Sequence, residues 1–228
     1  MNGTLSMTTA LAHDFFVVPK TFLSQEMTVD LDATISAAFP APENTVAADR
    51  IAGLQVLSTS RNARAEIAGA SEKTLRVRLQ DAGRGVSVVA LQTVSRDIEY
   101  AEDRIDLIMG EYEVAPEAAD AVRALSRPRT LRVSSTRVAK TYVCVADCSD
   151  RSATTRATVG GLEFVSADAK DEVSFRLQLN GSPLPDYPIA IVLADGSRQR
   201  ARTDASCWTT WKMPPLATPK TPPGRRGR

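Results

Sequence analysis

Histidine is almost absent from this chain of 228 residues, which contains His13 alone. Ser-His-Asp and Cys-His catalytic arrangements both need a histidine as general base, and one at the very start of the chain is a poor candidate for that role. The sequence also lacks a His/Cys cluster with zinc-site spacing and a phosphate-binding glycine loop. We therefore expect a protein that is not an enzyme.

An excess of charge of one sign is lacking too. Lys and Arg number 28 against 27 Asp and Glu, which leaves a net charge of +1. Nucleic acids and anionic membrane surfaces attract a basic field, so this balance argues against either as the main partner. No run approaches the ~18 apolar residues that cross a bilayer, and we expect no direct membrane insertion.

Cysteine is scarce, with Cys144, Cys148 and Cys207 only. The odd number rules out complete pairing within one chain. Cys144 and Cys148 fall in what reads as one extended segment, where a rise of ~3.3 Å per residue would separate their Cα atoms by about 13 Å. Because a disulfide spans no more than ~7 Å, we expect a bridge only if the chain turns between them.

Alternation of apolar and polar residues is the strongest pattern present. In residues 28–35, Val29, Leu31, Ala33 and Ile35 alternate with Thr and Asp, which predicts a half-buried strand. Such short runs, divided by Gly, Pro, Asn and Asp, are typical of antiparallel sandwiches. The sequence therefore predicts a mainly β fold with two antiparallel β-sandwich domains. The other predicted strands cover residues 75–79, 86–94, 142–146, 175–179 and 189–193.

One segment has helical periodicity instead. Ile105, Ile108, Met109 and Tyr112 follow the i, i+3, i+4, i+7 spacing of an amphipathic helix, and Pro116 is placed to open a second helix. The domain limits that follow are a first sandwich over residues 13–98, a helical connector over 99–127, a second, incomplete sandwich over 136–215 and a disordered Pro/Arg-rich tail over 216–228.

The start of the chain is interpreted as the remnant of a signal peptide over residues 1–12. Ala10-Leu11-Ala12 before His13 has the small-x-small pattern that signal peptidase cuts. The preceding residues lack the positive charge and apolar core of a leader, so the leader is expected to be truncated. A chance match in an alanine-rich chain is the alternative.

Several motifs, taken together, resemble one bacterial family. The chain is similar, over about residues 10–206, to the domain of unknown function 4198 (DUF4198), whose periplasmic members are often described as nickel-uptake or cobalt-transport accessory proteins. The resemblance implies export to the periplasm, immunoglobulin- or transthyretin-like sandwiches and a membrane metal-transporter component as partner. It rests on residues 12–19 (AHDFFVVP), 137–143 (RVAKTYV), 161–165 (GLEFV), 180–184 (NGSPL) and 203–205 (TDA).

This resemblance focuses attention on His13 and Asp14. If cleavage follows Ala12, the free amine and ring nitrogen of His13 would chelate a divalent transition metal such as nickel, and Asp14 would add an oxygen. The alternative is that His13 merely begins a strand. The predicted function is thus that of a non-catalytic periplasmic accessory protein that handles nickel or cobalt, or else an envelope protein-interaction module with no metal role.

The end of the chain departs from the family pattern. After residues 203–205 the family continues with Asp-Gly and two apolar strands, whereas this chain has Ser206-Cys207-Trp208. Prolines cannot enter central strands, so we expect weak order from about Cys207 onward, unless Trp208 and Trp211 anchor one short strand. The prolines that follow are Pro214, Pro215, Pro219, Pro222 and Pro223.

Overall fold

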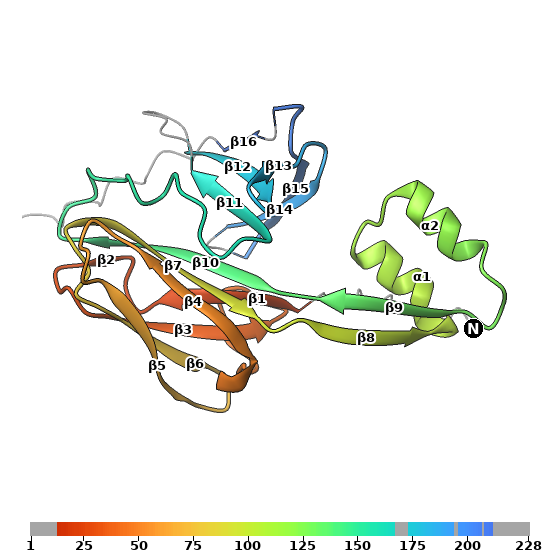
Figure 1. The fold of residues 1–228 in the computed structure, drawn as a ribbon, viewed down its shortest axis with the longest axis horizontal. Helices are drawn as coiled ribbons and strands as arrows, with labels where there is room; N and C mark the ends of the chain where they lie inside the picture. The colour runs from red at the N-terminus through yellow and green to blue at the C-terminus, as the bar shows by residue number, and fades with distance from the viewer. Residues whose placement is uncertain (1–12, 167–172, 194–195, 207, 212–228) are drawn as a thin grey trace, which may run out of the picture.

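The computed structural model describes residues 13–166, 173–193, 196–206 and 208–211. These residues form two β-sandwiches, a large one and a small one, and an arm that carries two helices (Figure 1). The mainly β prediction with a helical insertion is therefore confirmed. Within the described ranges, no helix has the length and apolar character needed to span a membrane.

The first sandwich consists of two four-stranded sheets. All its pairings are antiparallel except that of β2 with β10, which is parallel. A short 3-10 helix, η1 (Ala48–Arg50), precedes β4. One sheet has the order β1 (Asp14–Pro19), β3 (Val29–Ser36), β6 (Leu75–Gln80), β5 (Arg64–Ala70). The other has the order β2 (Leu23–Ser24), β10 (Val138–Val145), β7 (Gly85–Thr93), β4 (Ile51–Leu57).

The core of this sandwich is built from the apolar positions of alternating strands. Leu31 on β3 and Leu75, Val77 and Leu79 on β6 are fully buried, as is Val143 on β10. Burial of a Leu or Val side chain contributes about 1.5–3 kcal/mol. The polar residues between them face outward, and so the period-two pattern in the sequence selects the buried face.

The arm consists of a two-stranded ribbon and the two predicted helices. Figure 1 shows the ribbon carrying the helices away from the first sandwich. Ile105 and Met109 are buried against Ala119, whereas Tyr112, the last member of the predicted stripe, is exposed. The elements are β8 (Arg96–Ala101), α1 (Glu102–Glu111), α2 (Pro116–Arg123) and β9 (Thr130–Ser135).

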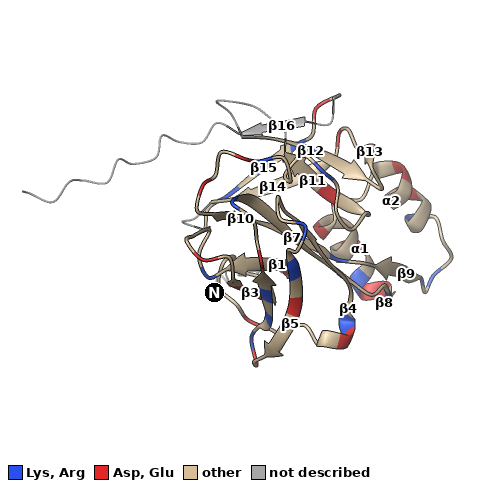
Figure 2. Cartoon of the chain, turned by 60° about the vertical axis from the view of Figure 1, so that its left-hand side comes forward, with Lys and Arg blue, Asp and Glu red and all other residues tan. Residues whose placement is uncertain are grey.

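The second sandwich is smaller. β11 (Leu162–Ser166) and β13 (Ser182–Pro183) pair with β12 (Val173–Leu179), as does β16 (Trp208–Trp211). A separate hairpin is formed by β14 (Pro188–Val192) and β15 (Arg198–Arg202). Charged residues of both signs are spread over both sandwiches and the arm (Figure 2).

The predicted domain limits are wrong at two strands. β8 crosses the limit between residues 98 and 99 and pairs with β9 in the arm, not with a strand of the first sandwich. Residues 138–145 were assigned to the second sandwich, but β10 pairs along its whole length with β7 of the first. Alternation indicates that a strand has a buried face, but it does not indicate which sheet the strand joins. The chain therefore leaves the first sandwich, forms the arm and returns to it before entering the second.

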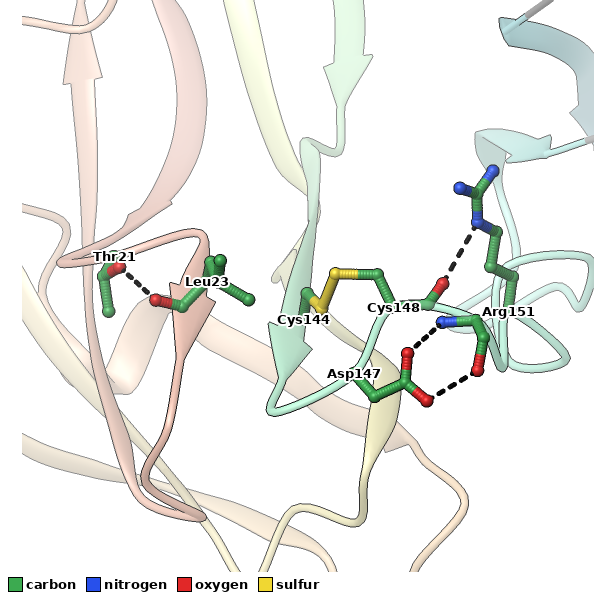
Figure 3. Close-up of a disulfide and its surroundings, with 7 residues drawn as sticks. Thr21, Leu23, Cys144, Asp147, Cys148 and Arg151 are labelled. Atoms are coloured by element: carbon green, nitrogen blue, oxygen red, sulfur yellow. Dashed lines mark hydrogen bonds between the residues drawn. A yellow bond between two sulfur atoms is a disulfide. The ribbon is translucent and has the colours of Figure 1, made fainter. Parts of the chain in front are cut away.

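The expected extended geometry around Cys144 is also wrong. Cys144 is the next-to-last residue of β10. Ala146 follows the strand with a left-handed φ of 59°, and the chain turns there. The turn brings the Cα atoms of Cys144 and Cys148 to 5.4 Å, and the two residues form a disulfide (Figure 3). Cys207 lies outside the described residues.

The expected weak order from Cys207 onward is wrong for residues 208–211, which form β16. Their backbone pairs in an antiparallel register with β12, from Trp208 opposite Arg176 to Trp211 opposite Val173. The alternative of one short strand between the two tryptophans is thus confirmed. The predicted tail over 216–228 and the predicted leader remnant over 1–12 lie outside the described residues.

Candidate binding cleft between the two sandwiches

A cleft of about 860 Å³ lies between the two sandwiches. Its walls come from β1 and β10 on one side and from β11, β12 and β14 on the other, and Figure 1 shows β11 beside β10. Four of the chain's six phenylalanines and three of its four tyrosines line it. Apolar and aromatic walls of this size with a few polar groups are the usual composition of a ligand site.

The polar groups of the cleft reach it because of the two-residue period of β10. Ala139, Thr141 and Val143 are buried on the other face of this strand. Because successive side chains point to opposite faces, Lys140 and Tyr142 are directed toward the second sandwich, and both line the cleft.

Lys140 forms a buried ion pair with Glu163 of β11. Its Nζ donates hydrogen bonds to Glu163 Oε2 at 3.1 Å and to the backbone oxygen of Phe164 at 2.9 Å. The Glu163 carboxylate also accepts bonds from the backbone N–H and hydroxyl of Thr158, at 3.0 and 2.8 Å. Burial lowers the pKa of Lys140, an effect that outweighs the opposing hydrogen bond to Glu163. This pair joins the two sandwiches.

Tyr142 presents a buried hydroxyl to the same region. Burial first, and then the negative charge of Glu163, raise the pKa of Tyr142 to about 12, so the phenol stays protonated near neutral pH. Its ring lies 6.5 Å from that of Phe175, centroid to centroid. Among the residues that the structure describes, the hydroxyl has no hydrogen-bond partner. Buried polar groups are nearly always bonded, so this hydroxyl is an exception among the described residues.

His13 and Asp14, the predicted metal ligands, both line the cleft but face different partners. His13 Nε2 lies 3.7 Å from Glu43 Oε2, and both side chains are substantially exposed. Asp14 Oδ2 instead accepts a hydrogen bond of 3.1 Å from Arg198 Nη2 of β15. The described ranges contain no group of three His, Cys, Asp or Glu residues that could hold a metal ion. Of the described residues around His13, only Glu43 is placed to join it in holding a metal ion. Metal binding at His13 stays a prediction.

Sequence reasoning assigned no role to Lys140, Glu163 or Tyr142. In the sequence, Lys140 and Glu163 belong to two separate motifs, at 137–143 and 161–165. The structure shows that these motifs contact each other through the two residues. The alternation of Leu162, Glu163 and Phe164 predicts that Glu163 faces solvent, whereas the structure buries Glu163 and leaves the two apolar neighbours 36% exposed. A charged residue on a buried strand face usually has a charged partner, but the sequence does not identify it.

Comparison with known proteins gives one match. A family model described as a domain of unknown function, DUF4198, matches residues 10–212. No curated protein and no solved structure is similar enough to match. The matched region spans both sandwiches, the arm and the whole cleft.

Proposed function

Since this chain belongs to the DUF4198 family, whose description specifies no reaction, we propose from the geometry that it is a non-catalytic binding protein whose ligand lies in the cleft between the sandwiches. The observation that carries this proposal is the concentration of aromatic side chains in the walls of the cleft. The ionisable groups beside it favour binding over chemistry. Lys140 and Glu163 bond to each other, and the high pKa of Tyr142 makes it a poor base at neutral pH.

An apolar fluorescent probe tests the cleft. 8-Anilinonaphthalene-1-sulfonate combines an aromatic body with an anion, and its fluorescence rises in apolar surroundings. We expect the wild-type protein to enhance its fluorescence, and Ile191→Glu, which places a carboxylate in the cleft wall, to lose most of the enhancement. Ile67→Glu on β5 provides a matched control, because Ile67 is already 37% exposed and does not line the cleft. Equal enhancement by all three proteins would refute the proposal.

We further propose that the protein acts in the periplasm as an accessory protein. The Cys144–Cys148 disulfide supports this, because disulfides persist in oxidising compartments such as the bacterial periplasm. The small-x-small motif before His13 supports it independently. Fractionation of the cells that naturally make the protein tests the location, and protein found only in their cytosol would contradict it.

Handling of nickel or cobalt is a second candidate function, favoured by the approach of His13 to Glu43. In a chain cleaved after Ala12, the terminal amine, the imidazole and the Glu43 carboxylate would supply the ligands. A divalent transition metal accepts nitrogen and oxygen donors of this kind. The protein would capture the metal ion and pass it to a membrane metal-transporter component.

A further inference from the structure

The free edge of β14 borders the cleft. Six consecutive residues, from Tyr187 to Val192, line it. Side chains of a strand alternate between its two faces, so this unbroken run of lining residues includes positions from both faces of β14. Among the described strands, β14 pairs with β15 alone, and the edge that faces away from β15 has no backbone partner there.

The hydrogen-bonding pattern of the β14–β15 hairpin identifies the backbone groups on the free edge of β14. Leu193 N donates to Ser197 O at 2.9 Å, and at the other end Thr203 N donates to Tyr187 O at 3.0 Å. In an antiparallel pair, alternate residues exchange bonds with the partner strand. Ile189 and Ile191 therefore direct their backbone groups to β15. The backbone N–H and C=O groups of Ala190 and Val192 point away from β15, and so does the C=O group of Pro188.

The apolar walls beside this edge are incompletely covered. Leu177 on β12 is buried, but Phe164 is 36% exposed, and Ile189 and Ile191 are only partly buried. Among the described residues, the clusters of buried apolar side chains lie in the first sandwich and between the helices. The second sandwich thus presents apolar surface and unpaired backbone in one place, the two features that an added strand satisfies.

The charges around the cleft limit what could be added. Lys140 is paired with Glu163, and Arg198 with Asp14. Arg137 also lines the cleft, and its Nη1 donates to the backbone oxygen of His13. No carboxylate pairs with Arg137 within the described ranges. One uncompensated guanidinium therefore remains beside the cleft and favours a carboxylate in the bound molecule.

We propose that β14 accepts an extended peptide of a partner protein as an additional antiparallel or parallel strand. The peptide bonds to the backbone of Ala190 and Val192, and its apolar side chains at alternate positions cover Phe164 and Ile191, which are only partly buried. An acidic residue of the peptide pairs with Arg137. This inference rests on the proposed binding function of the cleft and specifies its ligand class.

The test uses the full chain and two synthetic peptides. The first has valine at alternate positions, threonine between them and one terminal glutamate. The second has the same side chains, but N-methyl groups replace its backbone N–H at alternate positions. Both are followed by fluorescence anisotropy of an attached dye. We expect the N-methylated peptide to bind about tenfold or more weakly, since it loses one or two backbone hydrogen bonds.

Two proline substitutions in the protein test the same edge of β14. Ala190→Pro removes an N–H that points away from β15 and leaves the bonds to β15 intact, which an edge strand tolerates. Arg200 lies directly opposite Ala190 in the register, so Arg200→Pro places a proline on the other edge of the same hairpin. We expect Ala190→Pro to weaken binding of the first peptide about tenfold and Arg200→Pro to change it less than about twofold.

The outcomes separate this inference from the function on which it rests. If Ile191→Glu abolishes the fluorescence enhancement of the anilinonaphthalene probe but neither peptide binds, strand addition is refuted. The proposed binding function of the cleft then still stands. Equal affinity for both peptides would also overturn strand addition. Failure of the probe and both peptides would overturn both proposals. A concentration-dependent dimer that Ala190→Pro dissociates would assign the edge to a second copy of the chain and would refute a separate partner.

Discussion

Lys140 Nζ and Glu163 Oε2 lie 3.1 Å apart, in an ion pair that joins β10 of the first sandwich to β11 of the second. The side chains are 9% and 1% exposed. The two residues come from the motifs at 137–143 and 161–165 that resemble the DUF4198 family. Their contact gives these motifs a common structural role, which is to hold the second sandwich against the first and so shape the cleft.

Lys140→Met is expected to lower the free energy of unfolding by about 3 kcal/mol, because it leaves Glu163 buried without its cation. Lys140→Met combined with Glu163→Gln is expected to recover part of this loss, since the remaining group is then neutral. Lys20→Met is the control, because its pair with Asp32 is exposed and such pairs contribute at most ~1 kcal/mol. Urea unfolding measures all three. Equal losses for Lys20→Met and Lys140→Met would contradict a special role for the buried pair.

Tyr142→Phe is expected to keep or raise the free energy of unfolding, by up to about 1 kcal/mol, because it removes a buried hydroxyl that has no partner among the described residues. A stabilising substitution at a natural residue is the behaviour of a site kept for function. Thermal and urea unfolding of the free protein measure the effect. A clear destabilisation would show that the hydroxyl is bonded in the free protein.

The arm should respond to acid through Glu102. Hydrogen bonds from the side chain and backbone of Arg129 lower the pKa of Glu102 to about 2, from 4.5. A depressed carboxyl pKa stabilises the folded state above the unfolded pKa, and the contribution is lost as pH falls from about 4.5 toward 2. The difference in urea midpoint between wild type and Glu102→Gln should therefore shrink across that window.

Glu99→Gln is the matched control for the arm, because the pair of Glu99 with Arg132 is exposed and contributes little. We expect its urea midpoint to stay close to that of the wild type at every pH. A difference between Glu102→Gln and wild type that is independent of pH down to 2 would contradict the assignment of the effect to Glu102 ionisation.

Removal of the disulfide tests the turn at Ala146. The double substitution Cys144→Ala and Cys148→Ser is expected to cost about 2 kcal/mol, the chain-entropy value for so short a closed loop. Reduction of the wild-type protein should lower the free energy of unfolding to a similar extent. Without reduction, alkylation should modify one of the three cysteines. Modification of all three in the native, unreduced protein would show that the bond does not form.

Metal binding at His13 predicts a dependence on the chain start. A chain that begins at His13 is expected to bind Ni²⁺ measurably in calorimetry, because its terminal amine and imidazole form one chelate. A chain with residues preceding His13 should bind much more weakly. Glu43→Gln in the shorter chain should weaken binding, since Glu43 Oε2 lies 3.7 Å from His13 Nε2. Equal affinity of the longer and shorter chains would contradict this site.

Regular local patterns predicted several of the elements. The alternation around Leu31, Val77 and Leu177 corresponds to strands β3, β6 and β12, and the stripe from Ile105 corresponds to α1. Strands β4 and β5 were not predicted. Gly53 and Gly69 interrupt their alternation, and each strand has a register shift at its glycine. A bulge inserts a residue and breaks the period of two on which the prediction depends.

The sequence by itself determined the fold class, the helical insertion and the buried faces of β3 and β6, because these depend on side-chain period along a single element. Only the tertiary structure decided that β10 joins β7, that Cys144 reaches Cys148, and that Lys140 meets Glu163 beside Tyr142. Each of these is a contact between segments or across a turn. Such contacts depend on sheet order and on the path of the chain between elements, which periodicity does not encode.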